Sequence, residues 1–163
     1  GNAGAEEEKP ESAPAPRAFR EQLDKAIIAS AKLQSALAAD KQPTEAEVTA
    51  FAKAVATIDM KLLTGPGHMD WMKQLKGIQT GIDRMQKADG IAASRVGYES
   101  VSIGLIAALK KFGGTGTQPF YIYHCPMAFE DKGASWLQDK EGLLNPYFGS
   151  QMLRCGKLQE TMK

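Results

Sequence analysis

The chain has 163 residues, of which 20 are basic and 19 are acidic, so its formal net charge is +1. This length allows one domain whose core needs no metal or disulfide in order to fold. The balanced charge disfavours nucleic acid and anionic membrane surfaces as partners. No apolar run reaches the roughly 18 residues that cross a bilayer, so we predict no transmembrane segment.

Residues 1–16 are rich in Ala, Pro and Glu, a composition typical of a disordered tether. No signal peptide is recognisable, which indicates either a cytosolic protein or a mature, processed form. The start at Gly1 without an initiator Met indicates processing or truncation. A short polar tether commonly joins a lipoprotein domain to its membrane, with a lipobox cysteine just before the tether. We therefore expect a periplasmic or envelope-anchored protein; the alternative is that Gly1 is an artificial addition.

Four stretches carry apolar residues at helical spacing, and turn residues separate them. They predict helices over residues 17–39, 44–62, 67–88 and 91–112. Thr44 and Glu47 form a capping-box pattern at the start of the second helix, Asp89 is a candidate cap for the fourth, and Gly113 ends it. Four helices of similar length with short turns predict an up-down four-helix bundle over residues 17–114.

Residues 115–163 have a different pattern, with frequent Gly and Pro and many aromatic residues. Residues 120–123 are strand-like, whereas residues 134–137 predict a single helical turn. Such a segment stays ordered only by packing on something, and the bundle is the available surface. The predicted fold class is all-α, an up-down four-helix bundle with an irregular C-terminal tail packed on it, so that residues 17–163 form a single domain.

The tail also concentrates the side chains with the softest donor atoms. It holds both cysteines of the chain and one of its two histidines. Cys125 and Met127 flank a proline, so one tight turn can present both sulfur atoms. Cys155 can close such a site if the tail folds back. We predict a metal site with Cys125, Met127 and Cys155 as principal ligands, and with His124 and Met152 as further ligands.

These tail motifs resemble a bacterial domain of unassigned biochemistry, found alone or fused to periplasmic adaptor subunits of copper/silver RND efflux systems. The matching runs are residues 124–128 (His-Cys-Pro-Met-Ala), 136–137 (Trp-Leu), 145–149 (Asn-Pro-Tyr-Phe-Gly) and 152–156 (Met-Leu-Arg-Cys-Gly). The resemblance covers essentially the whole chain after Arg17. It implies a helical bundle followed by this tail, and a copper context.

Thiolate and thioether sulfur suit Cu(I) and Ag(I), and imidazole is a good companion ligand. We therefore expect a copper- or silver-binding protein that sequesters Cu(I) or hands it to an efflux adaptor or another envelope protein in metal resistance. Zn(II) is a weaker alternative because the chain lacks paired Cys-x-x-Cys spacing. His68, Met69 and Met72, at the start of the third helix, are possible additional ligands if they face the same end of the bundle.

Other interpretations of these residues remain open at this point. The two cysteines can form a disulfide, which closes a loop of about 30 residues and adds roughly 3 to 4 kcal/mol, or they can be unrelated free thiols. With a disulfide, the protein is an interaction module of an efflux or envelope complex. His124 and His68 can be ordinary polar packing residues, and several methionines can be core filler. No catalytic motif is present, so we do not predict an enzyme.

Overall fold

The computed structural model describes residues 15–163, and the predicted tether falls mostly outside this range. Ala15, the first described residue, is buried, and its carbonyl accepts a hydrogen bond from Arg20 Nε. The described elements are, in chain order, α1 (Arg17–Ala38), α2 (Glu45–Ala56), η1 (Met60–Leu62), α3 (Gly65–Lys87), α4 (Ile91–Phe112), β1 (Phe120–Cys125), α5 (Ala128–Asp131), β2 (Ala134–Gln138), η2 (Gly149–Gln151) and β3 (Lys157–Met162).

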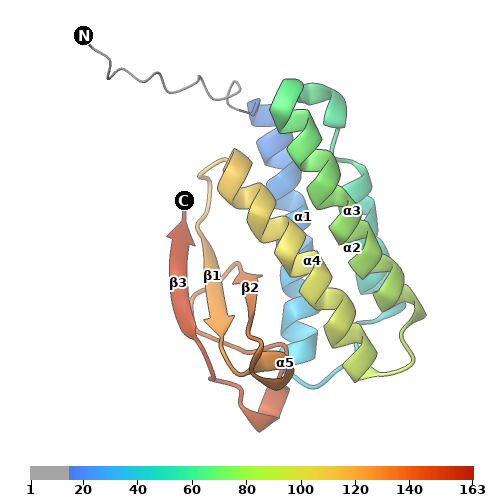
Figure 1. Ribbon diagram of the computed structural model, residues 1–163, viewed down its shortest axis with the longest axis vertical. Coiled ribbons are helices and arrows are strands. Elements are labelled where there is room, and N and C mark those ends of the chain that lie inside the picture. Colours follow the sequence, from blue (N-terminus) through green and yellow to red (C-terminus); the bar gives the residue numbers. More distant parts are fainter. Residues whose placement is uncertain (1–14) are drawn as a thin grey trace.

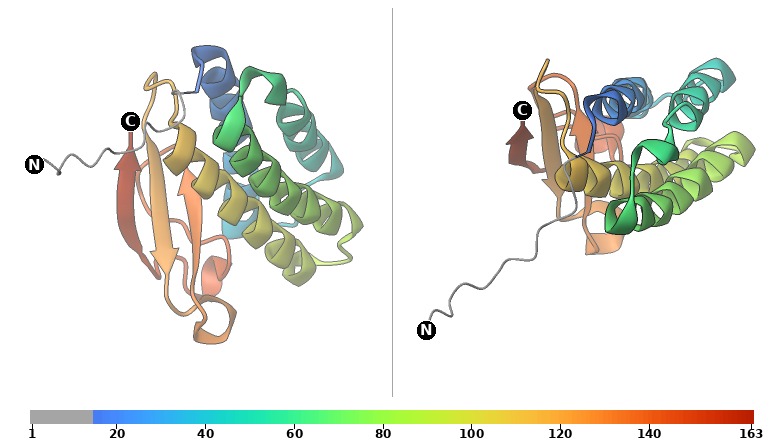
Figure 2. Two further views of the ribbon diagram at one scale, coloured as in Figure 1. Left: turned by 45° about the horizontal axis from the view of Figure 1, so that its top comes forward. Right: turned by 90° about the horizontal axis from the view of Figure 1, so that it is seen from above.

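The four long helices lie side by side and alternate in direction, as the apolar periodicity predicted (Figure 1). The C-terminal strands form a small sheet on one side of them. Seen from above, α1 and α4 lie next to the sheet, and α2 and α3 lie farther away (Figure 2). Strand β2 contacts both α1 and α4. The helices therefore provide the surface on which the C-terminal segment is built.

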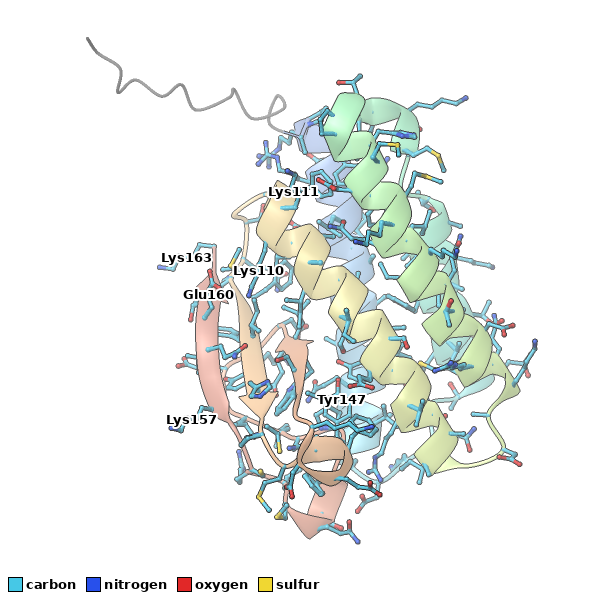
Figure 3. All side chains as sticks on the ribbon, in the orientation of Figure 1. Lys110, Lys111, Tyr147, Lys157, Glu160 and Lys163 are labelled. Carbon is cyan, nitrogen blue, oxygen red and sulfur yellow. The ribbon has the colours of Figure 1, made fainter. Side chains whose placement is uncertain are left out.

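The prediction of an all-α fold with an irregular tail is wrong for the tail. Its strands form one antiparallel sheet in the order β2-β1-β3. The predicted helical turn at residues 134–137 is part of strand β2. Cross-strand pairing decides its conformation, because Trp136 lies opposite Tyr123 and stacks on it with ring centroids 5.8 Å apart. Strand β3 is the exposed outer edge, and Figure 3 shows Lys157, Glu160 and Lys163 along it.

The helix termini follow the local sequence with two exceptions. The capping box is confirmed, because Thr44 Oγ1 accepts from the Glu47 backbone N–H and Glu47 accepts from that of Thr44. The second predicted helix is wrong beyond Ala56, because Asp59 accepts from the N–H of Lys61 and starts the separate turn η1. Asp89 does not cap α4; the residue at that position is Gly90.

One hydrophobic cluster joins the helices to the sheet. In its helical part, Phe19 near the start of α1 packs with its ring centroid 5.5 Å from that of Trp71 and 5.0 Å from that of Phe112. Trp136 and Cys125 belong to the same cluster on the sheet side and are fully buried. Between residues 15 and 163, no helix combines the length and the apolar character needed to cross a membrane.

Helices α3 and α4 approach each other closely at two facing glycines. A Cβ atom added to Gly81 would lie 2.5 Å from the carbonyl oxygen of Gly97, and one added to Gly97 would lie 2.8 Å from that of Gly81. Backbone atoms cannot move aside as the end of a flexible side chain can. By contrast, a Cβ atom at Gly77, on the same helix, meets nothing within 4 Å.

We expect Gly81→Ala to lower the free energy of unfolding by about 1 to 3 kcal/mol, because the methyl group overpacks the interface between α3 and α4. The matched control Gly77→Ala should raise it by about 0.5 to 1 kcal/mol, because alanine favours the helix and has room there. Chemical denaturation monitored by circular dichroism measures both. Equal effects of the two substitutions would mean that the helices do not pack at Gly81.

Candidate functional site

The two cysteines meet at the end of the sheet where β1 finishes and β3 begins. Cys125 is the last residue of β1, and Cys155 precedes β3 by two residues. Because β3 runs antiparallel to β1 and starts opposite His124, the topology returns Cys155 to the end of β1. The two Sγ atoms lie 2.8 Å apart, and both cysteines are free thiols. The sheet therefore brings the two predicted sulfur ligands together.

Asn145 holds the backbone of Cys155 by a hydrogen bond. Its Nδ2 donates to the carbonyl of Cys155 at 2.9 Å, and its Oδ1 accepts from the backbone N–H groups of Tyr147 and Phe148. The N–H of Asn145 also donates to the carbonyl of Leu153 at 2.8 Å. Asn145 is fully buried, so this side chain ties the Asn-Pro-Tyr-Phe-Gly turn to the cysteine that follows it.

A second clamp holds the same turn against the helices. Arg95 on α4 donates from Nε to the carbonyl of Pro146 and from Nη2 to that of Leu37, each at 2.8 Å. Its Nη2 also lies 3.1 Å from Asp40 Oδ1. Hydrogen bonds from Ser150 and Arg95 hold the pKa of the Asp40 carboxyl below its ordinary value. The turn thus has a fixed position relative to α1 and α4.

Tyr147 lies between the C-terminal segment and α4 (Figure 3). Its ring contacts those of Trp136, Phe129 and Tyr98, with centroids 5.2 to 5.9 Å away. Its hydroxyl donates to the carbonyl of Ser135 at 2.7 Å, and burial raises its pKa well above the ordinary value, so the phenol stays neutral. The ring contacts and this hydrogen bond give Tyr147, in the Asn-Pro-Tyr-Phe-Gly run, a structural role.

The segment labelled α5 is a left-handed turn. Phe129, Glu130 and Asp131 have φ values of 53°, 56° and 66°, a conformation that costs roughly 1 to 2 kcal/mol for each residue that carries a Cβ atom. The contact between Phe129 and Tyr147 and a hydrogen bond from the N–H of Gly133 to the carbonyl of Ala128 hold this turn closed. The turn follows Met127 directly.

The proximity of Cys125 changes the acidity of the Cys155 thiol. The hydrogen bond with Cys125, together with burial, raises the pKa of the Cys155 thiol to about 11, although the backbone N–H of Met127 partly opposes the rise. Cys125 is fully buried, whereas Cys155 is half-buried. Near neutral pH the Cys155 thiol is therefore mostly protonated, which slows its reactions as a nucleophile.

His124 does not join the cysteines in this structure. Neighbouring residues on a strand point to opposite faces, and the His124 ring lies with Nδ1 2.8 Å from Ser135 Oγ, on the face opposite Cys125. A Cβ atom added to Gly133 would lie 3.1 Å from His124 Nε2, so the ring packs closely against that glycine. The interpretation of His124 as a hydrogen-bonded polar residue agrees with this geometry.

The methionines predicted as ligands are spread over both ends of the molecule. Met127 follows β1 by two residues, and its side chain is 46% exposed. Met152 begins the short turn before Cys155, and its carbonyl accepts a hydrogen bond from the Cys155 N–H. His68, Met69 and Met72 lie at the start of α3, which is at the opposite end of the molecule from the end of β1 (Figure 1). The condition that they face the same end of the bundle as the cysteines is not met, because α3 begins at the end of the molecule where β1 begins and not where it finishes (Figure 1).

No group of three or more His, Cys, Asp or Glu side chains in residues 15–163 is arranged to hold a metal ion. A surface cleft of about 770 Å³ lies elsewhere, between α1, the start of α2 and residues 138–144. Neither cysteine lines it, and its charged side chains carry both signs. The cysteine pair is therefore separate from this cleft.

Sequence patterns did not single out Asn145 and Ser135 as positioning residues. For Asn145 a signal existed, since an Asn before Pro in a turn commonly accepts hydrogen bonds from the backbone two and three residues on. The partnership of Ser135 with His124 depends on the register of β1 and β2, which no short motif reveals.

The raised pKa of Cys155 predicts slow alkylation of the reduced protein. At pH 8 the rate at Cys155 should be roughly 100-fold below that of an ordinary thiol of pKa about 9, and it should keep rising up to about pH 11. Cys125→Ala removes the main cause of the shift and should move the plateau to lower pH. Iodoacetamide labelling followed by peptide mass spectrometry measures these rates; a plateau near pH 9 in the unmodified protein would contradict the thiol–thiol hydrogen bond.

Asn145→Asp separates the hydrogen bond that Asn145 makes to Cys155 from the hydrogen bonds that it makes within the turn. The carboxylate keeps both acceptor bonds to the turn but loses the donor to the Cys155 carbonyl, and it places a negative charge against that oxygen. We expect the free energy of unfolding to fall by about 2 to 3 kcal/mol and alkylation of Cys155 to accelerate. A stable variant with unchanged thiol reactivity would show that Asn145 does not position Cys155.

Comparisons with known proteins bear on the helices and not on the cysteines. The model of one family, described as a protein of unknown function (DUF3347), matches residues 31–117, slightly more than half of the chain. This range begins within α1, covers α2, α3 and α4, and stops before β1. Neither the curated proteins nor the solved structures gave a match. The expected membership of a domain of unassigned biochemistry is thus confirmed, and the chain belongs to the DUF3347 family.

Proposed function

We propose that this protein binds a soft monovalent metal ion, Cu(I) or Ag(I), between Cys125 and Cys155, and that it sequesters the ion or hands it on. The supporting observation is the convergence of two sulfur atoms from distant parts of the sequence, 2.8 Å apart at one end of the sheet. Thiolate sulfur is the donor that selects Cu(I). The high pKa of the Cys155 thiol favours a carrier over a nucleophilic catalyst.

The sulfur atoms must separate before they can hold an ion. A metal at about 2.3 Å from each sulfur, with an angle near 120°, places the two sulfurs about 4 Å apart. Cys125 is fixed on the central strand, so the movement falls to Cys155, which is half-buried and precedes the exposed edge strand. Binding also displaces the thiol protons, since only thiolates are ligands.

Met127 is the best placed candidate for a third ligand. It follows Cys125 by two residues, its backbone N–H donates to the Cys155 thiol, and its side chain is partly exposed. Met152 is a reserve ligand on the turn that precedes Cys155. Two thiolates with one thioether suit Cu(I) or Ag(I) better than Zn(II), which normally takes four ligands.

The proposed location and partner rest on the tail motifs. Their resemblance to the domain found with periplasmic adaptors of copper and silver efflux systems supports an exported protein of the bacterial envelope. A copper efflux adaptor or another envelope protein is then the recipient or donor of the ion. The exposed side of the site, at Met127, is where such a partner would bring its own sulfur ligands.

The same sulfur proximity supports a second candidate function. A disulfide between Cys125 and Cys155 would fasten the C-terminal segment, and the domain would then serve as an interaction module of an efflux or envelope complex. In that case the metal affinity of the reduced protein should be negligible, and Met127 should be replaceable without effect.

A Cu(I) competition titration against a chromogenic chelator on fully reduced protein tests the proposal. We expect one ion per chain, with binding lost in the Cys125→Ser, Cys155→Ser double variant. Met127→Leu should weaken binding about tenfold, which corresponds to about 1.4 kcal/mol. The matched control Met69→Leu, an exposed methionine at the other end of the molecule, should change nothing.

Circular dichroism of each variant verifies that the fold is intact. If the double variant binds as tightly as the unmodified protein, the cysteines are not the ligands. If the double variant loses binding but Met127→Leu leaves the affinity unchanged, Met127 is not the third ligand and the proposal for the two cysteines stands.

A further inference from the structure

We propose that the cysteine pair is also a redox gate, in which disulfide exchange through Cys155 closes the metal site and reduction reopens it. This inference rests on the proposed metal function and adds its regulation. The oxidant is a disulfide, either a small one such as glutathione disulfide or that of a redox protein.

The two states of the pair exclude each other geometrically. A disulfide needs its sulfurs about 2.05 Å apart, whereas a bridging metal needs about 4 Å. The observed separation of 2.8 Å lies between them. A small shift of Cys155 therefore leads to either state, and one chain cannot hold both. The disulfide also leaves no thiolate charge to bind a cation.

The exposure of the two cysteines gives the reaction a direction. Cys125 has no exposed surface and sits on β1, between β2 and β3. Cys155 is half-buried in the turn that precedes the edge strand. An incoming disulfide therefore reacts with Cys155 first, and the buried Cys125 then attacks the mixed disulfide as the resolving thiol.

The exchange balances in two steps. Cys155 loses its proton and its sulfur attacks one sulfur of RS–SR; that bond breaks, RS⁻ leaves and takes a proton, and a mixed disulfide forms on Cys155. Cys125 then loses its proton and attacks the Cys155 sulfur, expelling the second RS⁻, which is also protonated. The protein gives up two electrons and two protons, and RS–SR is reduced to two RSH.

The surrounding structure tolerates both states. Asn145 holds the Cys155 backbone by its carbonyl, and Gly156, at φ 134°, packs a Cβ-free backbone against the carbonyl of His124. Both contacts hold the backbone around Cys155, whereas its side chain contacts Cys125 Sγ and the backbone N–H of Met127. The gate thus operates by rotation of one side chain while β1 and β3 keep their pairing.

Single-cysteine variants test the direction of exchange without any metal. Reduced Cys125→Ser and Cys155→Ser proteins are incubated with glutathione disulfide at pH 8.5 or so, quenched with acid and weighed by mass spectrometry. We expect the Cys125→Ser protein to retain one glutathione on Cys155 and the Cys155→Ser protein to carry no glutathione. The protein with both cysteines should form an internal disulfide and carry no glutathione. Modification of both variants at equal rates, or no oxidation of the unmodified protein, would overturn the gate.

Ag(I) titration of the reduced, oxidised and re-reduced protein tests the consequence. Oxidation should weaken Ag(I) binding at least about a hundredfold, and reduction should restore it. If reduced protein binds and the double serine variant does not, yet the chain never oxidises, the gate is wrong and the metal function stands. If reduced protein fails to bind but oxidises as expected, the metal function is wrong, the gate falls with it, and the pair is a reversible staple.

Discussion

The antiparallel pairing of β3 with β1 is the constraint on which the site depends. It brings the end of the chain back to the end of the central strand and so sets Cys155 beside Cys125. The helices support this pairing through their contacts with β2 and through the hydrogen bond from Arg95 to the turn that follows β2. Asn145, on the same turn, positions Cys155 by donating a hydrogen bond to its carbonyl. The helices thus act at a distance from the sulfurs, as a foundation for the sheet.

The sulfur pair combines features that pull in different directions. Contact with Cys125 and burial raise the pKa of the Cys155 thiol and slow its reactions near neutral pH. The same contact places the two sulfurs close enough for oxidation or, after a small separation, for a soft metal. Cys125 is held on a central strand and Cys155 lies on a half-buried turn. A site with one fixed and one movable sulfur suits an ion that must be released, because exchange can begin at the movable side.

Local sequence patterns predicted the helices well, because apolar spacing and the capping box at Thr44 act within a few residues. They failed for the sheet. Strand β3 is exposed on nearly every residue and lacks the apolar alternation that marks a strand, so only its pairing with β1 reveals it. The cysteines could be singled out by residue type alone, whereas the placement of His124 on the opposite face, and of His68 at the opposite end of the molecule, required the topology.

X-ray absorption at the copper edge of the reduced, Cu(I)-loaded protein tests the central claim most directly. Sulfur bound by Cys125 and Cys155, with Met127 as a third ligand, predicts two or three sulfur neighbours at about 2.3 Å and none that scatter as an imidazole. A first shell made only of nitrogen and oxygen, or an imidazole signal that persists in a Cys125→Ser, Cys155→Ser variant, would contradict a metal site at the cysteine pair.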